Sequence, residues 1–138
     1  MKFEDSPLSI KFNFKKVVLS FGSIYMTNED FFVMEVNEGV HFNSEKLNEL
    51  LATVRLNYGD SKKLAYIANR INAYSIDPIL WSYFDKDDSI LVAASIVSYR
   101  DSTYLNANIE KQMAAIPLKR SHSLNEAVDW VGKLAEFN

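Results

Sequence analysis

The chain has 138 residues, of which 15 are Lys or Arg, 18 are Asp or Glu and 48% are apolar, and it has no Cys. This size is typical of one domain with its own core. The lack of Cys excludes disulfide scaffolds, thiolate metal sites and Cys nucleophiles, and a net charge of −3 gives no electrostatic reason to expect nucleic acid as a partner.

The sequence contains no candidate for a membrane span or for a cofactor loop. No segment approaches the roughly 18–20 apolar residues that cross a bilayer, and residues 1–7 lack the apolar core of a signal peptide. With only four glycines, no phosphate-binding Gly-rich loop is formed and no cofactor is predicted. We expect a cytoplasmic protein without membrane insertion, with a flexible N-terminus over 1–8 and a single domain over 9–138.

Three strands are expected in the N-terminal quarter. Apolar and polar residues alternate over 10–15, which is typical of a half-buried strand, and residues 17–19 extend or follow it. Further strand-like runs occupy 24–26 and 31–36. Because the connections are short and polar, we expect antiparallel neighbours in a hairpin or meander.

The next element is predicted to be an amphipathic helix. Asn43 or Ser44 can cap its start by accepting a bond from a free backbone N–H, and Gly59 favours the left-handed conformation at its end. The apolar side chains fall at helical spacing on one stripe, which predicts the face turned to the core. This stripe comprises Leu47, Leu50, Leu51, Val54 and Tyr58.

Two buried strands with a short helix between them follow. Residues 64–68 and 90–97 are apolar on both faces, as in strands that have parallel neighbours and helices packed on both sides. Asp77 and Pro78 are suited to be the cap and the first residue of a helix that runs to about residue 85. Its inward side chains are expected to be Ile79, Leu80, Tyr83 and Phe84.

The C-terminal third is expected to add two helices and an edge strand. Asp101 or Ser102 can cap the first of these helices, and Pro117 stops it. The predicted buried stripe of this helix is Leu105, Ile109 and Met113. A short edge strand is expected over 118–122.

The closing helix is predicted from a capping box. Ser123 and Glu126 have the spacing at which each side chain satisfies the backbone N–H of the other, and the apolar stripe continues to residue 135. The whole order of elements predicts an α/β domain. We expect a mixed β-sheet with antiparallel strands at the N-terminal side, followed by β-α units whose helices pack on the sheet.

The segment 69–78 is the strongest candidate for a functional surface. It leaves the end of a central strand, where ligands and partners collect in open α/β sheets, and enters a helix start that can receive an anion such as a serine phosphate. Its hydrogen-bonding and aromatic side chains are of the kinds enriched at interfaces. The candidate partner-binding or phospho-acceptor residues are Arg70, Asn72, Tyr74, Ser75, Asp77 and Trp81.

A purely structural interpretation of these residues stays open. In that interpretation Asp77 only caps the helix and Asn72 makes a turn. Tyr74 and Trp81 then complete the core. The functional interpretation rests on the tendency of polar loops at strand ends to carry function.

No assembled catalytic set can be recognised. An acid–base or metal site needs a histidine near a carboxylate in a fixed geometry. His41 follows Glu38 by three residues, but in a loop that contains Gly39 and whose geometry the sequence does not fix, and His122 is the weaker candidate. No nucleophile elbow is present. We therefore predict no metal site and no enzymatic activity.

The order of elements resembles the STAS domain, the fold of bacterial anti-sigma-factor antagonists. The loop at 37–43, followed by the leucine-rich helix described above, is similar to the segment after the opening strands of that family. In the family a central strand then delivers a loop whose serine or threonine is phosphorylated by a partner kinase. Here 66–68 and 69–77 occupy that place, and Ser75 carries the one Ser/Thr hydroxyl. The resemblance covers about residues 17–138, and extends to small bacterial STAS-like or CRAL-TRIO-like proteins.

Two functions from different classes follow. The first is a non-enzymatic regulatory module that meets a protein partner through the surface at 69–81. The alternative is a domain that binds a small ligand or lipid in an apolar pocket between sheet and helices, which the nine Phe, seven Tyr and two Trp would line. A homodimer is a further expectation, because Phe12 and Phe14 lie on one face of a candidate edge strand.

Overall fold

The computed structural model describes residues 1–84, 90–134 and 137. The expected end of the short helix, at about residue 85, and the expected last helical residue, 135, lie outside the described residues. Within the described part of the chain, no helix has the length and apolar character that crossing a membrane requires.

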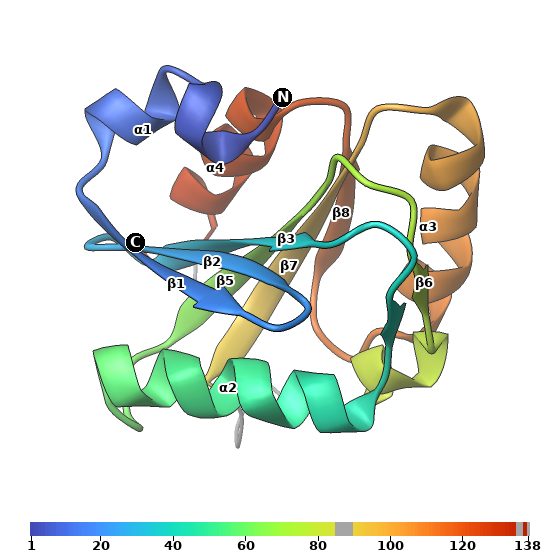
Figure 1. The fold of residues 1–138 in the computed structure, drawn as a ribbon, viewed down its shortest axis with the longest axis horizontal. Coiled ribbons are helices and arrows are strands. Elements are labelled where there is room, and N and C mark those ends of the chain that lie inside the picture. The colour runs from blue at the N-terminus through green and yellow to red at the C-terminus, as the bar shows by residue number, and fades with distance from the viewer. Residues whose placement is uncertain (85–89, 135–136, 138) are drawn as a thin grey trace.

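A six-stranded mixed sheet forms the centre of the molecule (Figure 1). In spatial order its strands are β1 (Phe14–Leu19), β2 (Gly22–Thr27), β3 (Phe31–Val36), β5 (Leu64–Arg70), β7 (Leu91–Ser98) and β8 (Leu118–Ser121). The pairs β1–β2 and β2–β3 are antiparallel, whereas β3–β5, β5–β7 and β7–β8 are parallel. The predicted α/β class, with antiparallel strands first and β-α units after them, is confirmed.

A second, smaller sheet joins two loops near the candidate segment. Its strands, β4 (His41–Phe42) and β6 (Ser75–Ile76), run parallel and place His41 opposite Ser75. The backbone of Ser75 donates to the carbonyl of Val40 at 2.9 Å. The loop after β3 and the loop after β5 are therefore fixed to each other.

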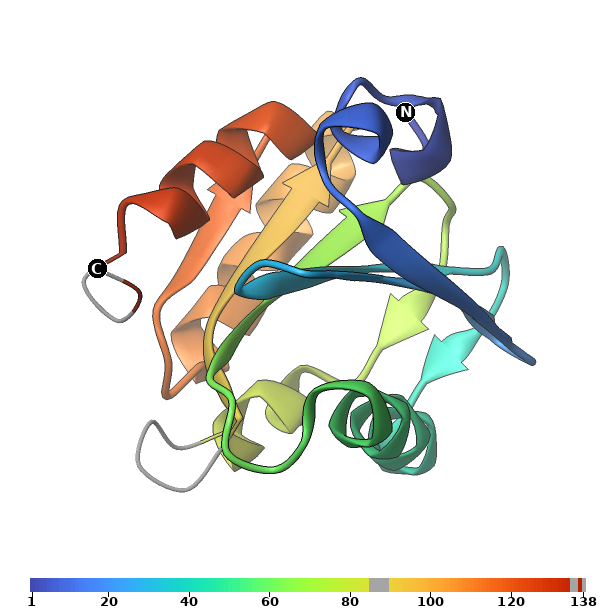
Figure 2. The same cartoon turned by 90° about the vertical axis from the view of Figure 1, so that its left-hand side faces the viewer.

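Helices cover both faces of the main sheet (Figures 1 and 2). They are η1 (Phe3–Asp5), α1 (Leu8–Lys11), α2 (Ser44–Tyr58), the 3-10 helix η2 (Pro78–Tyr83), α3 (Asp101–Met113) and α4 (Leu124–Gly132). α2 and η2 lie on one face, and α4 lies with the N-terminal helical turns on the other. α3 packs against η2, β7 and β8. Alternate strand residues therefore enter two separate cores.

The N-terminal segment, for which a flexible end over 1–8 is expected, packs against the core. Phe3 is fully buried, and its ring lies against those of Phe14 and Tyr25 at centroid distances of 5.2 and 5.0 Å. Leu8 is also buried in the cluster that includes α4. These apolar side chains hold η1 and α1 on the sheet, because leaving them in water would forfeit the free energy of their burial.

The first strand begins at Phe14, and the expected strand over the preceding residues is wrong. Residues Leu8–Lys11 form α1, in which Ile10 is 89% exposed. Phe12 packs edge-on against Phe31 with centroids 5.2 Å apart. The rings of Phe12 and Phe14 thus point into the molecule and not toward a partner. β1 is nevertheless an edge strand, and the homodimer stays a prediction.

α2 agrees with its sequence prediction at both ends. The side chain of Asn43 accepts a bond from the N–H of Lys46 at 3.1 Å, so Asn43 is the cap. Gly59 follows the helix with φ of 87°, a conformation that side chains with a Cβ rarely adopt. The predicted stripe is buried or partly buried against the sheet.

The inward face of η2 is only partly as predicted. Asp77 accepts from the N–H of Ile79 at 3.2 Å and thus caps the helix as expected. Leu80 and Phe84 are buried, whereas Ile79 and Tyr83 are 42% and 61% exposed. A 3-10 helix turns more tightly than an α-helix, so that the residues sharing a face differ from those expected at a spacing of 3.6.

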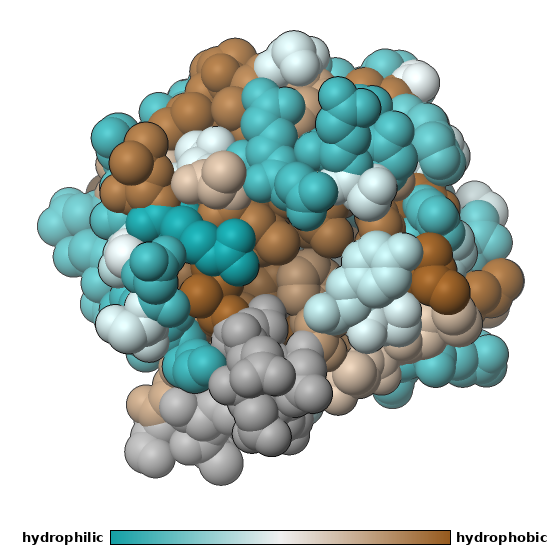
Figure 3. Space-filling view, turned by 90° about the horizontal axis from the view of Figure 1, so that it is seen from below, coloured by the Kyte–Doolittle hydropathy of each residue, from teal (hydrophilic) through white to brown (hydrophobic). Residues whose placement is uncertain are grey.

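Figure 3, which views the molecule from below, shows hydrophobic area exposed among hydrophilic side chains.

The predicted stripe of α3 is wrong. Leu105, Ile109 and Met113 are 66%, 56% and 37% exposed, whereas Ala107 and Glu110 are buried. The helix starts at Asp101, and its cap residue makes no side-chain capping bond. α3 is therefore rotated relative to the expected orientation, with a carboxylate facing the interior.

α4 begins as the capping-box pattern predicts, with one difference. Ser123 Oγ accepts from the N–H of Glu126 at 3.1 Å. The carboxylate of Glu126 accepts from the N–H of His122 at 2.9 Å, one residue before the expected donor. This bond, together with Lys119, lowers the pKa of Glu126 below its ordinary value. The edge strand β8, which ends just before His122, is as predicted.

Candidate functional site

The candidate segment forms one wall of a groove at the carboxyl ends of β5 and β7. The other wall is one side of α3 together with the residue before it, and the cavity between them measures about 450 Å³. Arg70, Tyr74 and Ser75 contribute from the first wall and Arg100 and Asn106 from the second. We refer to this cavity as the β5–α3 groove. The strand ends place it where open α/β sheets bind ligands.

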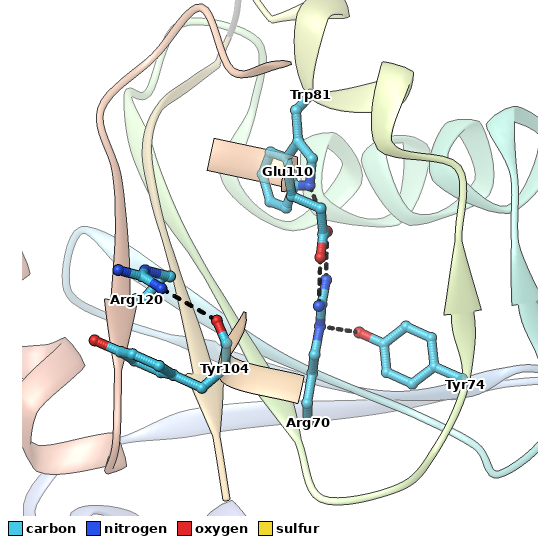
Figure 4. Close-up of polar contacts among 6 residues, drawn as sticks. All are labelled: Arg70, Tyr74, Trp81, Tyr104, Glu110 and Arg120. Atoms are coloured by element: carbon cyan, nitrogen blue, oxygen red, sulfur yellow. Dashed lines mark hydrogen bonds and ion pairs between the residues drawn. The ribbon is translucent and has the colours of Figure 1, made fainter. Parts of the chain in front are cut away.

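A buried ion pair forms the floor of the β5–α3 groove (Figure 4). The two terminal nitrogens of Arg70 donate to the two carboxylate oxygens of Glu110, both at 2.5 Å. Only 7% of the Arg70 side chain and 3% of the Glu110 side chain are exposed. The two parallel bonds match the planar geometry of both groups, which makes this one of the stronger kinds of polar contact.

Two aromatic side chains complete this buried network. Trp81 Nε1 donates to Glu110 at 2.7 Å, and Arg70 Nε donates to the hydroxyl of Tyr74 at 3.1 Å. Burial raises the pKa of Tyr74 above its ordinary value, although the charge of Arg70 acts in the opposite direction. Burial by itself would lower the pKa of Arg70, but its contacts with Tyr74 and Glu110 outweigh this and raise it. Arg70 therefore stays charged.

The exposed part of the segment is Ala73, Ser75 and Asp77, with Asn72 partly exposed. Ser75 Oγ lies 2.8 Å from Nδ1 of His41, and this pair is accessible to solvent. Asn72 Nδ2 donates to the carbonyl of Val36 at 3.0 Å. These bonds hold the exposed positions in one conformation.

The structure therefore divides the six predicted site residues into three groups. Ser75 and Asp77 are exposed, as a contact site requires, and Asn72 and Tyr74 are partly exposed. The side chains of Arg70 and Trp81 are buried and hold the walls of the groove together. Trp81 is part of the core and Asp77 caps η2, as the purely structural interpretation of these residues predicts. The prediction that this segment reaches the rim of the sheet agrees with the structure.

Sequence reasoning missed Glu110. A carboxylate within a helix that also carries a regular apolar stripe is normally assigned to the solvent face. Its spacing of three residues from Ala107 is the signal that could have identified the buried face. The partner that draws Glu110 inward, Arg70, is 40 residues away along the chain.

The core between the main sheet, α2 and η2 offers little room for the apolar ligand of the alternative hypothesis. Among the described residues, an apolar cavity lies between sheet, α2 and η2, lined by side chains such as Phe42, Tyr66 and Trp81. It measures only about 10 Å³, which is at most the space of one water molecule. The many aromatic side chains thus fill this core, for example through the contact of Tyr66 with Trp81 at 5.7 Å.

A second buried polar cluster lies on the other face of the sheet. Asn69 Nδ2 donates to Glu35 Oε2 at 2.7 Å, and the hydroxyl of Tyr99 donates to Asn69 Oδ1 at 2.6 Å. Glu35 also accepts from the backbone of Phe3 at 2.7 Å, and Asn69 donates to the carbonyl of Met1 at 2.9 Å. The N-terminal segment thus supplies partners for this cluster, and these bonds hold the segment on the sheet.

The remaining histidine takes part in a stack at the edge of the sheet. His122 stacks on Tyr104 with centroids 4.2 Å apart, and the guanidinium of Arg120 lies 4.4 Å from the centre of the same ring. Arg120 also donates to the carbonyl of Tyr104, as Figure 4 shows. No group of three or more potential metal ligands occurs among the residues whose positions are described.

Comparisons with known proteins bear on the fold. No family model matches the sequence, and no curated protein matches it. Among solved structures, the chain is similar to an uncharacterized protein of the DUF3478 family from Shewanella loihica PV-4, which is described as having a SpoIIAA-like fold. The two are 7% identical, the match covers 86% of this chain and 92% of the other, and the TM-score is 0.51. The fold is SpoIIAA-like.

The SpoIIAA-like, or STAS-like, fold confirms the resemblance inferred from the sequence at the level of architecture. The order of elements, the mixed sheet and the helices on both faces carry this likeness. At 7% identity the likeness concerns the fold alone. Any function must therefore be argued from the residues of this chain.

Proposed function

We propose that the chain is a non-enzymatic regulatory module that binds a protein partner through the surface at 69–81. The observation that carries this proposal is the rigid display of Ser75 on the rim of the sheet. Its hydroxyl is exposed and bonded to His41, while its backbone is held by β4. A preorganised surface binds with less loss of conformational entropy than a mobile loop.

The polar surroundings of Ser75 support this role. Asp77 and Ala73 are exposed on either side of it, and the backbone of Ala73 donates to Glu38 at 2.8 Å. The patch thus combines a backbone held in place with exposed polar side chains, as the rim of an interface does. Arg70, which the sequence suggested as a partner for a phosphate, is fully engaged by Glu110.

His41 is the group placed to respond to a phosphate on Ser75. Its Nδ1 is 2.8 Å from the hydroxyl oxygen, and a phosphate brings close to two negative charges and several acceptor oxygens. An N–H at Nδ1 of His41 would donate to that phosphate. Modification would thereby change the charge of the surface without changing the fold, which is the property a regulated contact needs.

The experiment places a photo-crosslinking amino acid at position 75 of the full chain in its native cells. A matched control carries it at Ser61, an exposed serine beyond α2. We expect a discrete crosslinked species with the crosslinker at position 75 that is absent with the crosslinker at position 61. With the crosslinker at position 72 instead, we expect Ser75→Glu to change the yield of the crosslinked partner. Identical products at both positions, or none at either, would contradict the proposal.

A further inference from the structure

The β5–α3 groove contains more donor groups than the fold itself uses. Ser102, Thr103 and Asn106 line it from α3, and their side chains make no hydrogen bond to any described part of the chain. Arg100 lines its mouth and likewise meets no carboxylate among the residues the structure describes. A groove of about 450 Å³ falls within the usual size range of sites for small molecules.

The lining of the groove carries a net positive charge. Its lining includes two guanidinium groups, Arg70 and Arg100, and one carboxylate, Glu110. Both oxygens of Glu110 are taken by Arg70, and one also by Trp81, so that no free carboxylate faces the cavity. The net charge of the lining is therefore +1, and it comes from Arg100. An anion is attracted to such a cavity, whereas a cation finds no partner.

The neutral groups of the lining restrict the ligand further. The hydroxyls of Ser75, Ser102 and Thr103 and the amide of Asn106 each donate and accept. Groups of this kind match the hydroxyls of a ligand, because a hydroxyl also donates and accepts. The apolar part of the wall, formed by Ala73, Ile76, Pro78 and Ile109, can contact the carbon skeleton of a ligand. The lining thus favours a small molecule that carries hydroxyl groups on a carbon skeleton.

From this combination we infer that the β5–α3 groove binds a small hydroxylated molecule that carries one anionic group, a phosphate or a carboxylate. Arg100 pairs with the anionic group at the mouth of the groove. Asn106 and the neighbouring serine and threonine hydroxyls form hydrogen bonds with the hydroxyls of the ligand. The buried pair of Arg70 and Glu110 serves as a rigid floor. This inference does not depend on a protein partner, and its failure would leave the proposed contact at Ser75 untouched.

The test uses the full chain and three probes: glucose 6-phosphate, gluconate and uncharged glucose. Amide chemical shifts report where each probe binds, and calorimetry gives its affinity. We expect glucose 6-phosphate, gluconate or both to shift the resonances of 72–75 and 100–106, with glucose weaker by about tenfold or more, since a charge-assisted contact is lost.

Two variants separate charge from shape. Arg100→Ala should weaken the binding of the anionic probes by about tenfold. Arg55→Ala makes the same change of charge on the exposed face of α2 and should leave their affinity unchanged. Asn106→Phe fills the groove from an exposed helical position and should abolish binding. Equal losses in both arginine variants, binding of glucose as tight as that of the anions, shifts outside the groove, or no binding of any probe would overturn the inference.

Discussion

Arg70 at the end of β5 and Glu110 on α3 form a buried bidentate ion pair that joins two elements 40 residues apart in sequence. The pair sets the orientation of α3, because Glu110 must face the interior to reach the guanidinium. It also fixes the distance between the walls of the β5–α3 groove. One contact thus links the packing of the helix to the shape of the candidate site.

Removing one partner of this pair should destabilise the fold. In Glu110→Ala the buried guanidinium of Arg70 and the indole N–H of Trp81 lose their acceptor. We expect the free energy of unfolding to fall by about 3–5 kcal/mol, as for other broken buried pairs. Urea denaturation measures this change.

The matched controls for that variant are a distant carboxylate and a double substitution. Glu49 is exposed on α2, and Glu49→Ala should change stability by less than about 0.5 kcal/mol. The double variant Arg70→Met with Glu110→Leu should recover part of the loss, since no unpaired charge stays buried. A Glu110→Ala protein as stable as the wild type would show that the ion pair is not formed.

The N-terminal segment should contribute to stability as a core element does. Phe3→Ala removes a fully buried ring that touches Phe14 and Tyr25, which typically costs about 3–5 kcal/mol. Ile10→Ala, at a position 89% exposed, should have almost no effect. Chemical denaturation of the two variants compares them directly, and equal stabilities would restore the idea of a loosely held terminus.

Gly22 should be intolerant of a methyl group, unlike Gly132. A Cβ at Gly22 would meet the backbone carbonyl of Glu35 and lie 2.7 Å from Met34 Cε, whereas one at Gly132 meets nothing within 4 Å. Gly22→Ala should therefore cost about 1–3 kcal/mol through overpacking. Gly132→Ala, at the end of α4, should be neutral or stabilising by up to about 1 kcal/mol. Thermal unfolding of both variants tests this order, which the reverse ranking would contradict.

Stability should fall at alkaline pH in part through Tyr99. Burial, with the nearby charge of Glu35, raises the pKa of Tyr99 to about 12, whereas a tyrosine in the unfolded chain ionises near 10. The folded state thus keeps a proton that the unfolded state loses. The contribution of Tyr99 to the free energy of unfolding is therefore complete below about pH 10 and is lost as the pH rises through about 12. Tyr99→Phe should show a shallower decline over this range in denaturation experiments, and an unchanged slope would contradict the assignment.

The two misassigned regions show why sequence patterns failed there. Over 10–15 the alternation of Ile10, Phe12 and Phe14 has the period of a strand. The burial of Phe3 and Leu8, however, brings the chain onto the face of the sheet that α4 covers, and Ile10 lies in the helical turn α1. In α3 the apolar stripe is real, but the free energy of pairing Glu110 with Arg70 and Trp81 decides which face turns inward. Neither partner is local in sequence.

The sequence by itself determined the class of the fold, the order of the larger strands and helices after residue 17, the caps at Asp77 and Ser123, and the placement of 69–78 at the rim of the sheet. These features depend on periodicity and on bonds between neighbours, which act over a few residues. Only the tertiary structure decided that Arg70 and Trp81 are buried, that α3 turns Glu110 inward, and that Ser75 meets His41. Those outcomes arise from contacts between residues 29 to 40 positions apart, whose energies exist only once the sheet has brought them together.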